Sequence, residues 1–333
     1  MIIGIFNNKG GVGKTTYLYH LAHTLSAKGK TVLLIDGDPQ CNLTAYALDD
    51  AVIERSWSPE RGNSIFNAIE PLHESMGDFR KRRPTQVNPE AYPNLWIVPG
   101  DPALSNFEDT LGDAWRGARG GNAADLRKQS ALYRFASWAS NEIKADFTFL
   151  DLGPNLGPLN RTCLTSCDYF IVPVSPDLFS IRGTLNLGRK LVMWRRDWDN
   201  IRVAGAETEI DLPTGAPVFL GYMRQQYNVR ADGEEGMTAG WRIFGQQIEG
   251  AIQQNIVAPL RPLGQVIDWE DGEYDLGNVP NLHSLVPYSQ DARKPIFDCN
   301  GADGVRGAHL ARAREARDLF EPMAESLINL LSR

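Results

Sequence analysis

The sequence predicts an α/β protein in which helices cover both faces of one mostly parallel, twisted sheet. Short apolar runs alternate along the chain with segments whose apolar residues recur at helical spacing, and a glycine-rich turn follows the first run. This alternation is typical of βαβ units, whose crossovers are right-handed and lay helices over a parallel sheet. A chain of 333 residues without a clear linker favours one domain, residues 1–333, with insertions.

The strands are predicted where short apolar runs are bounded by turn residues. They cover residues 2–6, 31–35, 95–98, 147–150, 169–174, 218–223 and 284–286. The helices are predicted between them, over about 15–28, 129–143, 181–195, 239–256 and 308–331. In the first helix Leu18, Leu21 and Leu25 share a face, and Gly29 lies where a C-terminal glycine cap belongs.

Three stretches of different composition look like insertions into this alternation. They cover about 52–93, 112–125 and 197–238, and the first contains the basic run Arg80-Lys81-Arg82-Arg83. An acidic loop is expected over 268–275. None of these stretches carries a motif that predicts its role.

Composition limits the classes of function. The net charge is −7, so a DNA contact would need a local basic patch rather than a basic surface overall. The four cysteines include one close pair, Cys163 and Cys167, and a zinc site usually needs a second pair or histidines. We therefore expect free thiols in a reducing cytosol, and no signal peptide before the first apolar run.

A glycine-rich loop lies between the first predicted strand and the first predicted helix. Glycines let the backbone turn several N–H groups toward one phosphate group, and the helix N-terminus adds its positive dipole end. Lys14 can reach the β- and γ-phosphates, and the Thr15 hydroxyl can bind Mg²⁺. The predicted nucleotide-binding residues are Lys9, Gly10, Gly11, Val12, Gly13, Lys14, Thr15 and Thr16.

Carboxylates follow two of the predicted strands. Asp36 and Asp38 end the second strand, and Asp151 ends the apolar run 147–150. The carboxyl ends of parallel strands line the ligand crevice, so Asp151 is expected beside Mg²⁺. A glycosidase-like carboxylate pair is a poor alternative, because the phosphate loop lies next to these residues in the fold.

The motif Lys-Gly-Gly-x-Gly-Lys-Thr-Thr resembles the deviant Walker A motif of the ParA/MinD family of P-loop ATPases. Position 8, where the ordinary P-loop has glycine, is Asn8. Residues 36–42 resemble the family's Asp-x-Asp-Pro-Gln-x-Asn motif. The resemblance implies MgATP as ligand and an ATP-bound homodimer in which Lys9 reaches the partner's nucleotide. It also implies that Asp38 positions the attacking water and that Asp36 supports the magnesium shell.

The resemblance assigns catalysis to Lys9, Lys14 and Asp38 and the metal site to Thr15, Asp36 and Asp151. No glutamate follows Asp151, so slow, partner-stimulated ATP hydrolysis is expected. Gly153 stands where the family often has a proline, which would loosen this loop.

Two further segments resemble the family more weakly. Residues 169–176 and 180–183 resemble the strand after switch II, which lies near the dimer interface, although plain sheet core explains them equally well. Residues 286–288 resemble the late loop that frames the adenine, which implies adenine contacts for Pro287 and Tyr288.

The sequence leaves the cargo and the partners open. ParA-like dimers commonly bind DNA nonspecifically through basic side chains, and a ParB-like protein or another partner can activate them. A solvated helix face is the alternative reading of the same side chains. The candidate DNA-binding residues are Arg80, Lys81, Arg82, Arg83, Arg293, Lys294, Arg314 and Arg317.

Two classes of function remain. One is partition or positioning of DNA or another cargo; the other is an ATP-dependent regulatory subunit in secretion, polymer synthesis or defence, which binds a protein partner without DNA. A redox ATPase like the nitrogenase iron protein would need cluster cysteines that have no match here. The apolar, nearly uncharged end 327–333 is expected to pack as a helix rather than to bind a membrane. We expect a cytoplasmic protein, associated with the nucleoid if it binds DNA.

Overall fold

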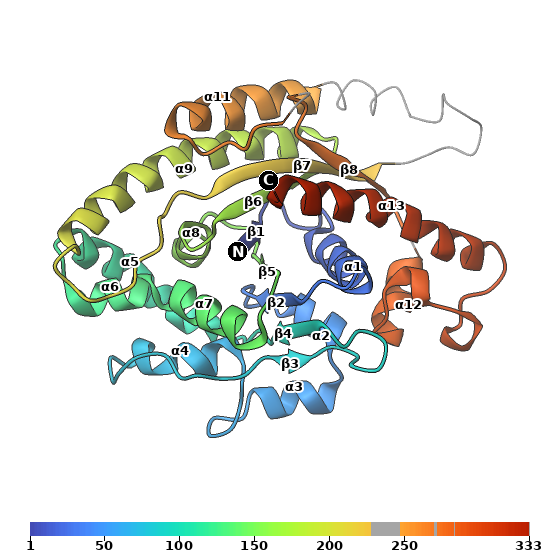
Figure 1. Ribbon diagram of the computed structural model, residues 1–333, viewed down its shortest axis with the longest axis horizontal. Coiled ribbons are helices and arrows are strands. Elements are labelled where there is room, and N and C mark those ends of the chain that lie inside the picture. The colour runs from blue at the N-terminus through green and yellow to red at the C-terminus, as the bar shows by residue number, and fades with distance from the viewer. Residues whose placement is uncertain (228–246, 270–271, 283, 333) are drawn as a thin grey trace.

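The computed structural model describes residues 1–227, 247–269, 272–282 and 284–332 (Figure 1). Its centre is an eight-stranded sheet with the order β3-β4-β2-β5-β1-β6-β7-β8. All neighbouring strands are parallel except β3 and β4. The strands are β1 Ile2–Ile5, β2 Val32–Asp36, β3 Thr85–Gln86, β4 Leu95–Val98, β5 Phe147–Asp151, β6 Tyr169–Val174, β7 Val218–Tyr227 and β8 Asp275–Pro280.

Helices cover both faces of this sheet, as the sequence predicts (Figure 1). On one side lie α1, α2, α12 and α13, and on the other α4 to α9 with the helical segment around 247–260. The helices are α1 Lys14–Ala27, α2 Asn42–Ala47, α3 Asp50–Ser56, α4 Ile65–His73, α5 Leu104–Arg119, α6 Ala123–Gln129, α7 Ala131–Ile143, α8 Pro158–Thr165, α9 Leu178–Ala204, a π-turn Gln253–Val257, α11 Ala258–Leu260, α12 Leu285–Ala292 and α13 Ala308–Leu331.

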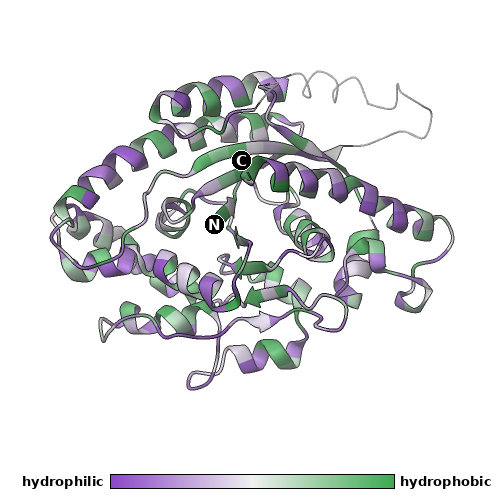
Figure 2. Ribbon diagram, in the orientation of Figure 1, coloured by the Kyte–Doolittle hydropathy of each residue, from purple (hydrophilic) through white to green (hydrophobic). Residues whose placement is uncertain are grey.

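The core has two layers that the sheet separates. In β2, Leu33 and Ile35 point into one layer while Val32 and Leu34 point into the other. All four side chains are buried, because a parallel sheet covered on both faces exposes neither set. Figure 2 shows the same pattern, with hydrophobic residues gathered in the central strands.

Most predicted elements are confirmed, and one predicted strand is wrong. Residues 284–286 were predicted as a strand, but they form the N-cap and first residues of α12, and the edge strand beside β7 is β8 instead. Strand β8 escapes prediction because its sequence, DLGNVP, is polar and contains Gly277 at a φ of 129°. Of the predicted helix 239–256, residues 239–246 lie outside the described part.

Helices α4, α5 and α6 and strand β3 occupy much of the predicted insertions 52–93 and 112–125. Residues 197–204 belong to the end of α9, and the part of the third stretch over 228–238 lies outside the described residues.

The C-terminal helix α13 packs on α1, as the apolar end of the chain predicts. Phe320 is fully buried, and its ring stacks on His20 with 5.1 Å between centroids. Leu327 is also buried, so this end of α13 contributes to the core. Within the described residues, none of the helices has the length and apolar character needed to cross a membrane.

Candidate nucleotide-binding site

The loop between β1 and α1 forms a cradle for an anion. Gly11 and Gly13 adopt φ angles of 70° and 78°, which glycine reaches without strain. The Asn7 side chain fixes the start of the loop: its Nδ2 donates to Pro173 O at 2.5 Å, and its Oδ1 accepts from Lys9 N at 2.9 Å. The loop then opens directly into α1, whose first N–H groups have no helical partner.

Thr15 and Asp151 meet at the bottom of this cradle. The Thr15 hydroxyl donates to Asp151 Oδ2 at 2.7 Å. Burial raises the pKa of Asp151 to about 6, although Thr15 and the Lys14 ammonium act in the opposite direction. The other oxygen, Oδ1, is buried and makes no hydrogen bond within the described part of the chain. A half-buried hydroxyl beside a buried carboxylate oxygen that makes no hydrogen bond within the described chain fits a hydrated Mg²⁺.

The Lys14 side chain lies near Asp151 and is buried. Burial lowers its pKa, and the carboxylates of Asp151 and Asp38 partly offset this. Among the described residues, no group of three or more His, Cys, Asp or Glu side chains could hold a metal ion.

Asp36 is fully buried and organises the segment that follows it. Its Oδ2 accepts hydrogen bonds from Thr44 N at 2.8 Å and from the Thr44 hydroxyl at 2.6 Å, and its Oδ1 accepts from Asp38 N at 3.3 Å. Burial raises its pKa to about 7, and the neighbouring Asp151 adds to this. Both oxygens therefore face their own segment, an arrangement that fits indirect support of a metal shell.

Asp38 lies between the phosphate loop and the segment after β5. Its Oδ1 accepts from Gln40 N at 3.0 Å. A Cβ on Gly153 would lie 3.3 Å from the same oxygen, so the carboxylate packs directly on that glycine. A Cβ on Gly10 would lie 3.8 Å from Pro154, so the segment after β5 also contacts the loop. The structure thus brings Asp38 to the phosphate side of the site.

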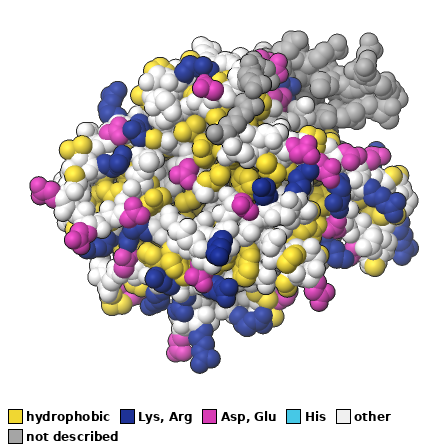
Figure 3. Space-filling view, viewed as in Figure 1, with side chains coloured by type: hydrophobic (Ala, Val, Ile, Leu, Met, Phe, Trp, Pro, Cys, Tyr) yellow, Lys and Arg dark blue, Asp and Glu magenta, His cyan; other side chains and the backbone are white. Residues whose placement is uncertain are grey.

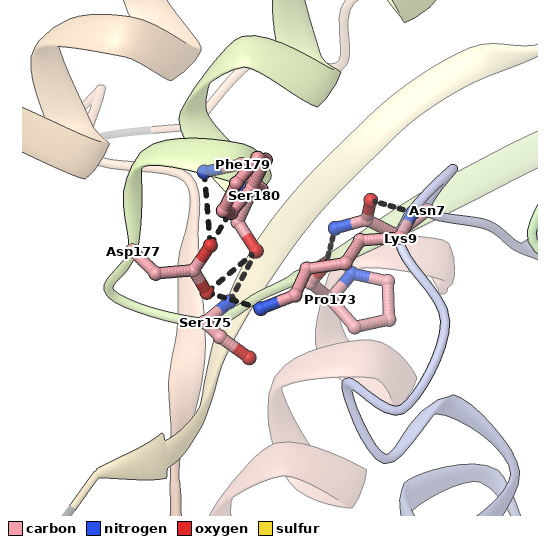
Figure 4. Close-up of polar contacts among 7 residues, drawn as sticks. All are labelled: Asn7, Lys9, Pro173, Ser175, Asp177, Phe179 and Ser180. Atoms are coloured by element: carbon pink, nitrogen blue, oxygen red, sulfur yellow. Dashed lines mark hydrogen bonds and ion pairs between the residues drawn. The ribbon is translucent and has the colours of Figure 1, made fainter.

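Lys9 points toward the start of α9, as Figure 4 shows. Its Nζ lies 2.5 Å from Asp177 Oδ2 of the same chain. Asp177 is also the N-cap of α9 and accepts from Phe179 N and Ser180 N. The sequence analysis missed Asp177 as a cap because it predicted the helix from residue 181, whereas α9 begins at Leu178.

The predicted adenine contacts lie on a helix, so the expected loop is wrong. Pro287 and Tyr288 belong to α12, and the Tyr288 ring packs beside Gly304. Gln225, at the end of β7, reaches the phosphate loop instead: a Cβ on Gly13 would lie 2.2 Å from its Oε1. Gln225 is buried, and the sequence analysis missed it because its neighbour in space is more than 200 positions away.

Ion pairs within the chain engage most of the candidate DNA-binding side chains. Arg80 pairs with Glu70, Arg83 with Glu142, Arg293 with Asp50, Lys294 with Asp303, and Arg317 with Asp298. Arg82 donates to the carbonyl of Glu60. On the face shown in Figure 3, Lys and Arg side chains are interspersed with Asp and Glu. The basic run and the α12–α13 cations therefore belong to surfaces of mixed charge.

Comparison with known proteins gives a consistent result. A family model described as an AAA domain matches residues 1–200. The chromosome partitioning protein ParA of Caulobacter vibrioides is 29% identical over 191 residues, which are 57% of this chain and 61% of that protein. Protein SopA of Escherichia coli is 27% identical over 63% of this chain and 49% of SopA. The chain thus spans about half to three fifths of these two relatives.

Solved structures share the fold over most of the chain. The crystal structure of protein DIP2308 from Corynebacterium diphtheriae is 28% identical, covers 88% of this chain and 96% of that one, and superposes with a TM-score of 0.69. A Cyanothece McdA variant in complex with ATP covers 98% of this chain and 95% of its own, with 15% identity and a TM-score of 0.60. At 15% identity, the likeness to McdA shows a shared fold and no more.

Proposed function

Because the chain belongs to the ParA/MinD-like family of P-loop ATPases, we propose that it is an ATP-dependent switch that binds MgATP, dimerises and hydrolyses ATP slowly. The observation that carries the proposal is the meeting of Thr15, Lys14 and Asp151 beneath a glycine loop at the start of α1. The N-terminus of α1 and the end of β5 supply these groups beside a glycine loop, so a triphosphate is the ligand that fits them.

Each side chain has a separate task in this proposal. The loop N–H groups and Lys14 hold the β- and γ-phosphates, and Thr15 and Asp151 hold Mg²⁺, Asp151 through water. The ion, when bound, neutralises charge on the phosphates. Asp38 orients the attacking water from its position on Gly153. Asp36 keeps Asp38 and Thr44 in place through its three hydrogen bonds.

Lys9 is proposed to act on the nucleotide of a second copy, as the family resemblance implies. A cation from outside the site would offset phosphate charge during transfer, as an arginine finger does. Slow turnover follows because residues 152–155 supply no acidic side chain. An activating partner, ParB-like or of another kind, would then set the rate.

We propose partition or positioning of DNA or another cargo as the biological role, in the cytoplasm and on the nucleoid if DNA is bound. Its support is the likeness to a chromosome partitioning protein. The alternative is a regulatory subunit that binds a protein partner without DNA. The intramolecular ion pairs of the basic candidates and the net charge of −7 favour this second function.

The first test is nucleotide binding and assembly. Titration calorimetry of the whole chain with MgATP should show binding, and Lys14→Ala should weaken it at least about tenfold, because one charge-assisted contact to phosphate is lost. Lys190→Ala, a change of an exposed lysine on α9, should bind normally. Sedimentation with MgATP and with MgADP should then give a dimer only with MgATP. A bound nucleotide with identical monomer profiles would contradict the switch.

A further inference from the structure

The contact between Lys9 and Asp177 is built into a fixed part of the structure (Figure 4). Asp177 Oδ1 accepts from Phe179 N at 2.9 Å and from Ser180 N at 3.0 Å, while its Oδ2 holds the Lys9 ammonium. The carboxylate thus caps the longest helix of the described chain and cannot follow Lys9 without uncapping it. Any movement that separates the pair must come from the flexible lysine.

The start of α9 packs directly on the phosphate loop. A Cβ on Gly183 would lie 2.2 Å from Asn8 Oδ1 and 3.4 Å from Asn7 Oδ1, so the helix approaches the side chains at the start of the loop closely. Asp177 therefore lies beside the same loop that presents Lys9. Lys14, by contrast, interacts electrostatically with Asp151 and Asp38. The two lysines of the motif therefore interact with different acidic side chains.

Two large apolar side chains stand exposed beside this ion pair. Leu178 is 53% exposed and Phe179 is 74% exposed, and both follow Asp177 directly. Because Leu178 and Phe179 are adjacent and lie beside the phosphate loop, they form a candidate contact surface for another molecule. In a two-fold dimer the same patch occurs on both copies, so this patch and Lys9 would face their equivalents together.

We propose that Asp177 is a positioning residue that holds Lys9 within its own protomer, and that a second copy seated on Leu178 and Phe179 takes Lys9 over. The inference rests on the proposed function, in which Lys9 serves the other copy's nucleotide. An ammonium that leaves Asp177 for a phosphate loses this ion pair, so Asp177 opposes assembly until nucleotide is present. The contact thereby sets the protein concentration at which the ATP-bound dimer forms.

The charge state of Asp177 agrees with this role. Burial alone would raise its pKa, but the Lys9 ammonium and the N–H groups of Ser180 and Phe179 lower it by more. The carboxylate is therefore ionised over the physiological range and available to Lys9 at all times. Among the described side chains, it is the acid that the structure pairs with Lys9.

The variant Asp177→Asn separates the two tasks of this residue, because asparagine caps a helix as well as aspartate but carries no charge. Sedimentation in Mg²⁺ and a non-hydrolysable ATP analogue should show tighter dimers. Partly exposed ion pairs are worth a factor of about two to five each, and a dimer releases two, so the dissociation constant should fall about 4- to 25-fold. On a Lys9→Ala background the same substitution should change nothing.

The apolar part is tested by Phe179→Ser, which should weaken the dimer at least about tenfold while nucleotide binding is kept. Val203→Ser and Asp199→Asn are matched controls: Val203 is 78% exposed on the same helix, and Asp199 pairs with Arg195. Both should assemble like the parent chain. Equal or weaker assembly of Asp177→Asn, or identical behaviour of Phe179→Ser and Val203→Ser, would overturn the proposal.

A measurement on the monomer keeps the restraint on Lys9 apart from the proposed function. Without nucleotide, acylation of Lys9 by a small reagent, followed by peptide mass spectrometry, should be about two- to fivefold faster in Asp177→Asn. Lys190 in the same sample gives the reference rate. An unchanged rate at Lys9 removes the proposed restraint even if ATP binds. Failure of the parent chain to bind ATP removes the proposed function and the hand-over of Lys9 to a second copy, while a faster rate in Asp177→Asn would still show the restraint within one protomer.

Discussion

At the scale of single residues, the site depends on where three carboxylates point. Asp151 faces the hydroxyl of Thr15, Asp36 faces Thr44, and Asp38 lies against Gly153. Each therefore has a different expected effect when it is removed. Loss of Asp36 would disorganise a segment, whereas loss of Asp38 would leave the remaining hydrogen bonds of the site intact.

Asp38→Ala is expected to keep MgATP binding and to lower the rate of hydrolysis about 10²- to 10⁴-fold, the usual effect of removing a group that handles the attacking water. Calorimetry and single-turnover phosphate release measure the two properties separately. Asp50→Ala, which removes an exposed carboxylate beyond α2, should leave both unchanged. Normal turnover in Asp38→Ala would contradict its assigned role.

Gly153→Ala is expected to slow hydrolysis several-fold without changing the affinity for ATP. The added Cβ would lie 3.3 Å from Asp38 Oδ1, so the carboxylate must shift away from the water it orients. Gly112→Ala, with open space around the new Cβ, is the control. In an Asp38→Ala background the Gly153 substitution should have no further effect on the rate; an additive loss would show that the glycine acts elsewhere.

At the scale of elements, α1 carries two buried histidines, and a hydrogen bond of His20 fastens the helix to a neighbouring segment. His20 Nε2 accepts from Ile296 N at 2.9 Å, and its Nδ1 lies 2.6 Å from Thr16 O. His23 Nδ1 lies 2.7 Å from Tyr19 O. Burial lowers the pKa of His20 to about 4 and that of His23 to about 3. Both rings are therefore neutral in the native protein near neutral pH.

The stability that these histidines give should fall as the pH drops below about 6.5, because only the unfolded chain then takes up protons. Asp36 and Asp151, whose pKa values are raised, act in the opposite sense over the same range. To separate the effect of the histidines from that of these carboxylates, the parent chain is compared with the double variant His20→Gln, His23→Gln. From pH 7 to pH 5 the parent chain should lose roughly 2–4 kcal/mol more unfolding free energy than this variant.

Urea unfolding at the two pH values measures this difference. His309→Gln changes an exposed histidine and should behave as the parent chain does. Equal pH dependence in the parent chain and the double variant would show that the buried rings do not resist protonation.

The elements also show what the sequence could and could not predict. Strands β1, β2 and β5 were predicted because they are continuous apolar runs, and the phosphate loop because its glycines follow such a run. The same method predicted 284–286 as a strand, since three apolar or small residues carry no period that separates strand from helix. Asp177 and Gln225 were missed because only the folded chain brings them to the loop.

At the scale of the whole molecule, the distribution of charge decides between the two proposed roles. The candidate DNA-binding side chains already form ion pairs with acids of the same chain. DNA phosphates would therefore have to compete with these contacts. We expect at most weak DNA binding. A gel shift with MgATP should show a complex at low salt that disappears near physiological salt, where counterion release no longer favours it.

Arg314→Ala, which removes an exposed cation of α13, tests whether that face takes part. Arg55→Ala, on α3, is the control for a cation outside the predicted set. A complex that persists at high salt would favour partition of DNA, and the absence of any shift at low salt would favour the protein-partner role.

The short helix α2 makes hydrogen bonds both to Asp36 of the nucleotide site and to Ser289 of α12, and so connects the two regions. Thr44 near its start is bonded to Asp36, and Tyr46 near its end donates to Ser289 on α12 at 2.8 Å. If phosphate binding moves Asp38, the displacement is transmitted through Asp36, Thr44 and Tyr46 to α12 in the C-terminal region. Amide exchange in α12 that differs between MgATP and MgADP would reveal such a lever, and identical exchange would show that the two regions are uncoupled.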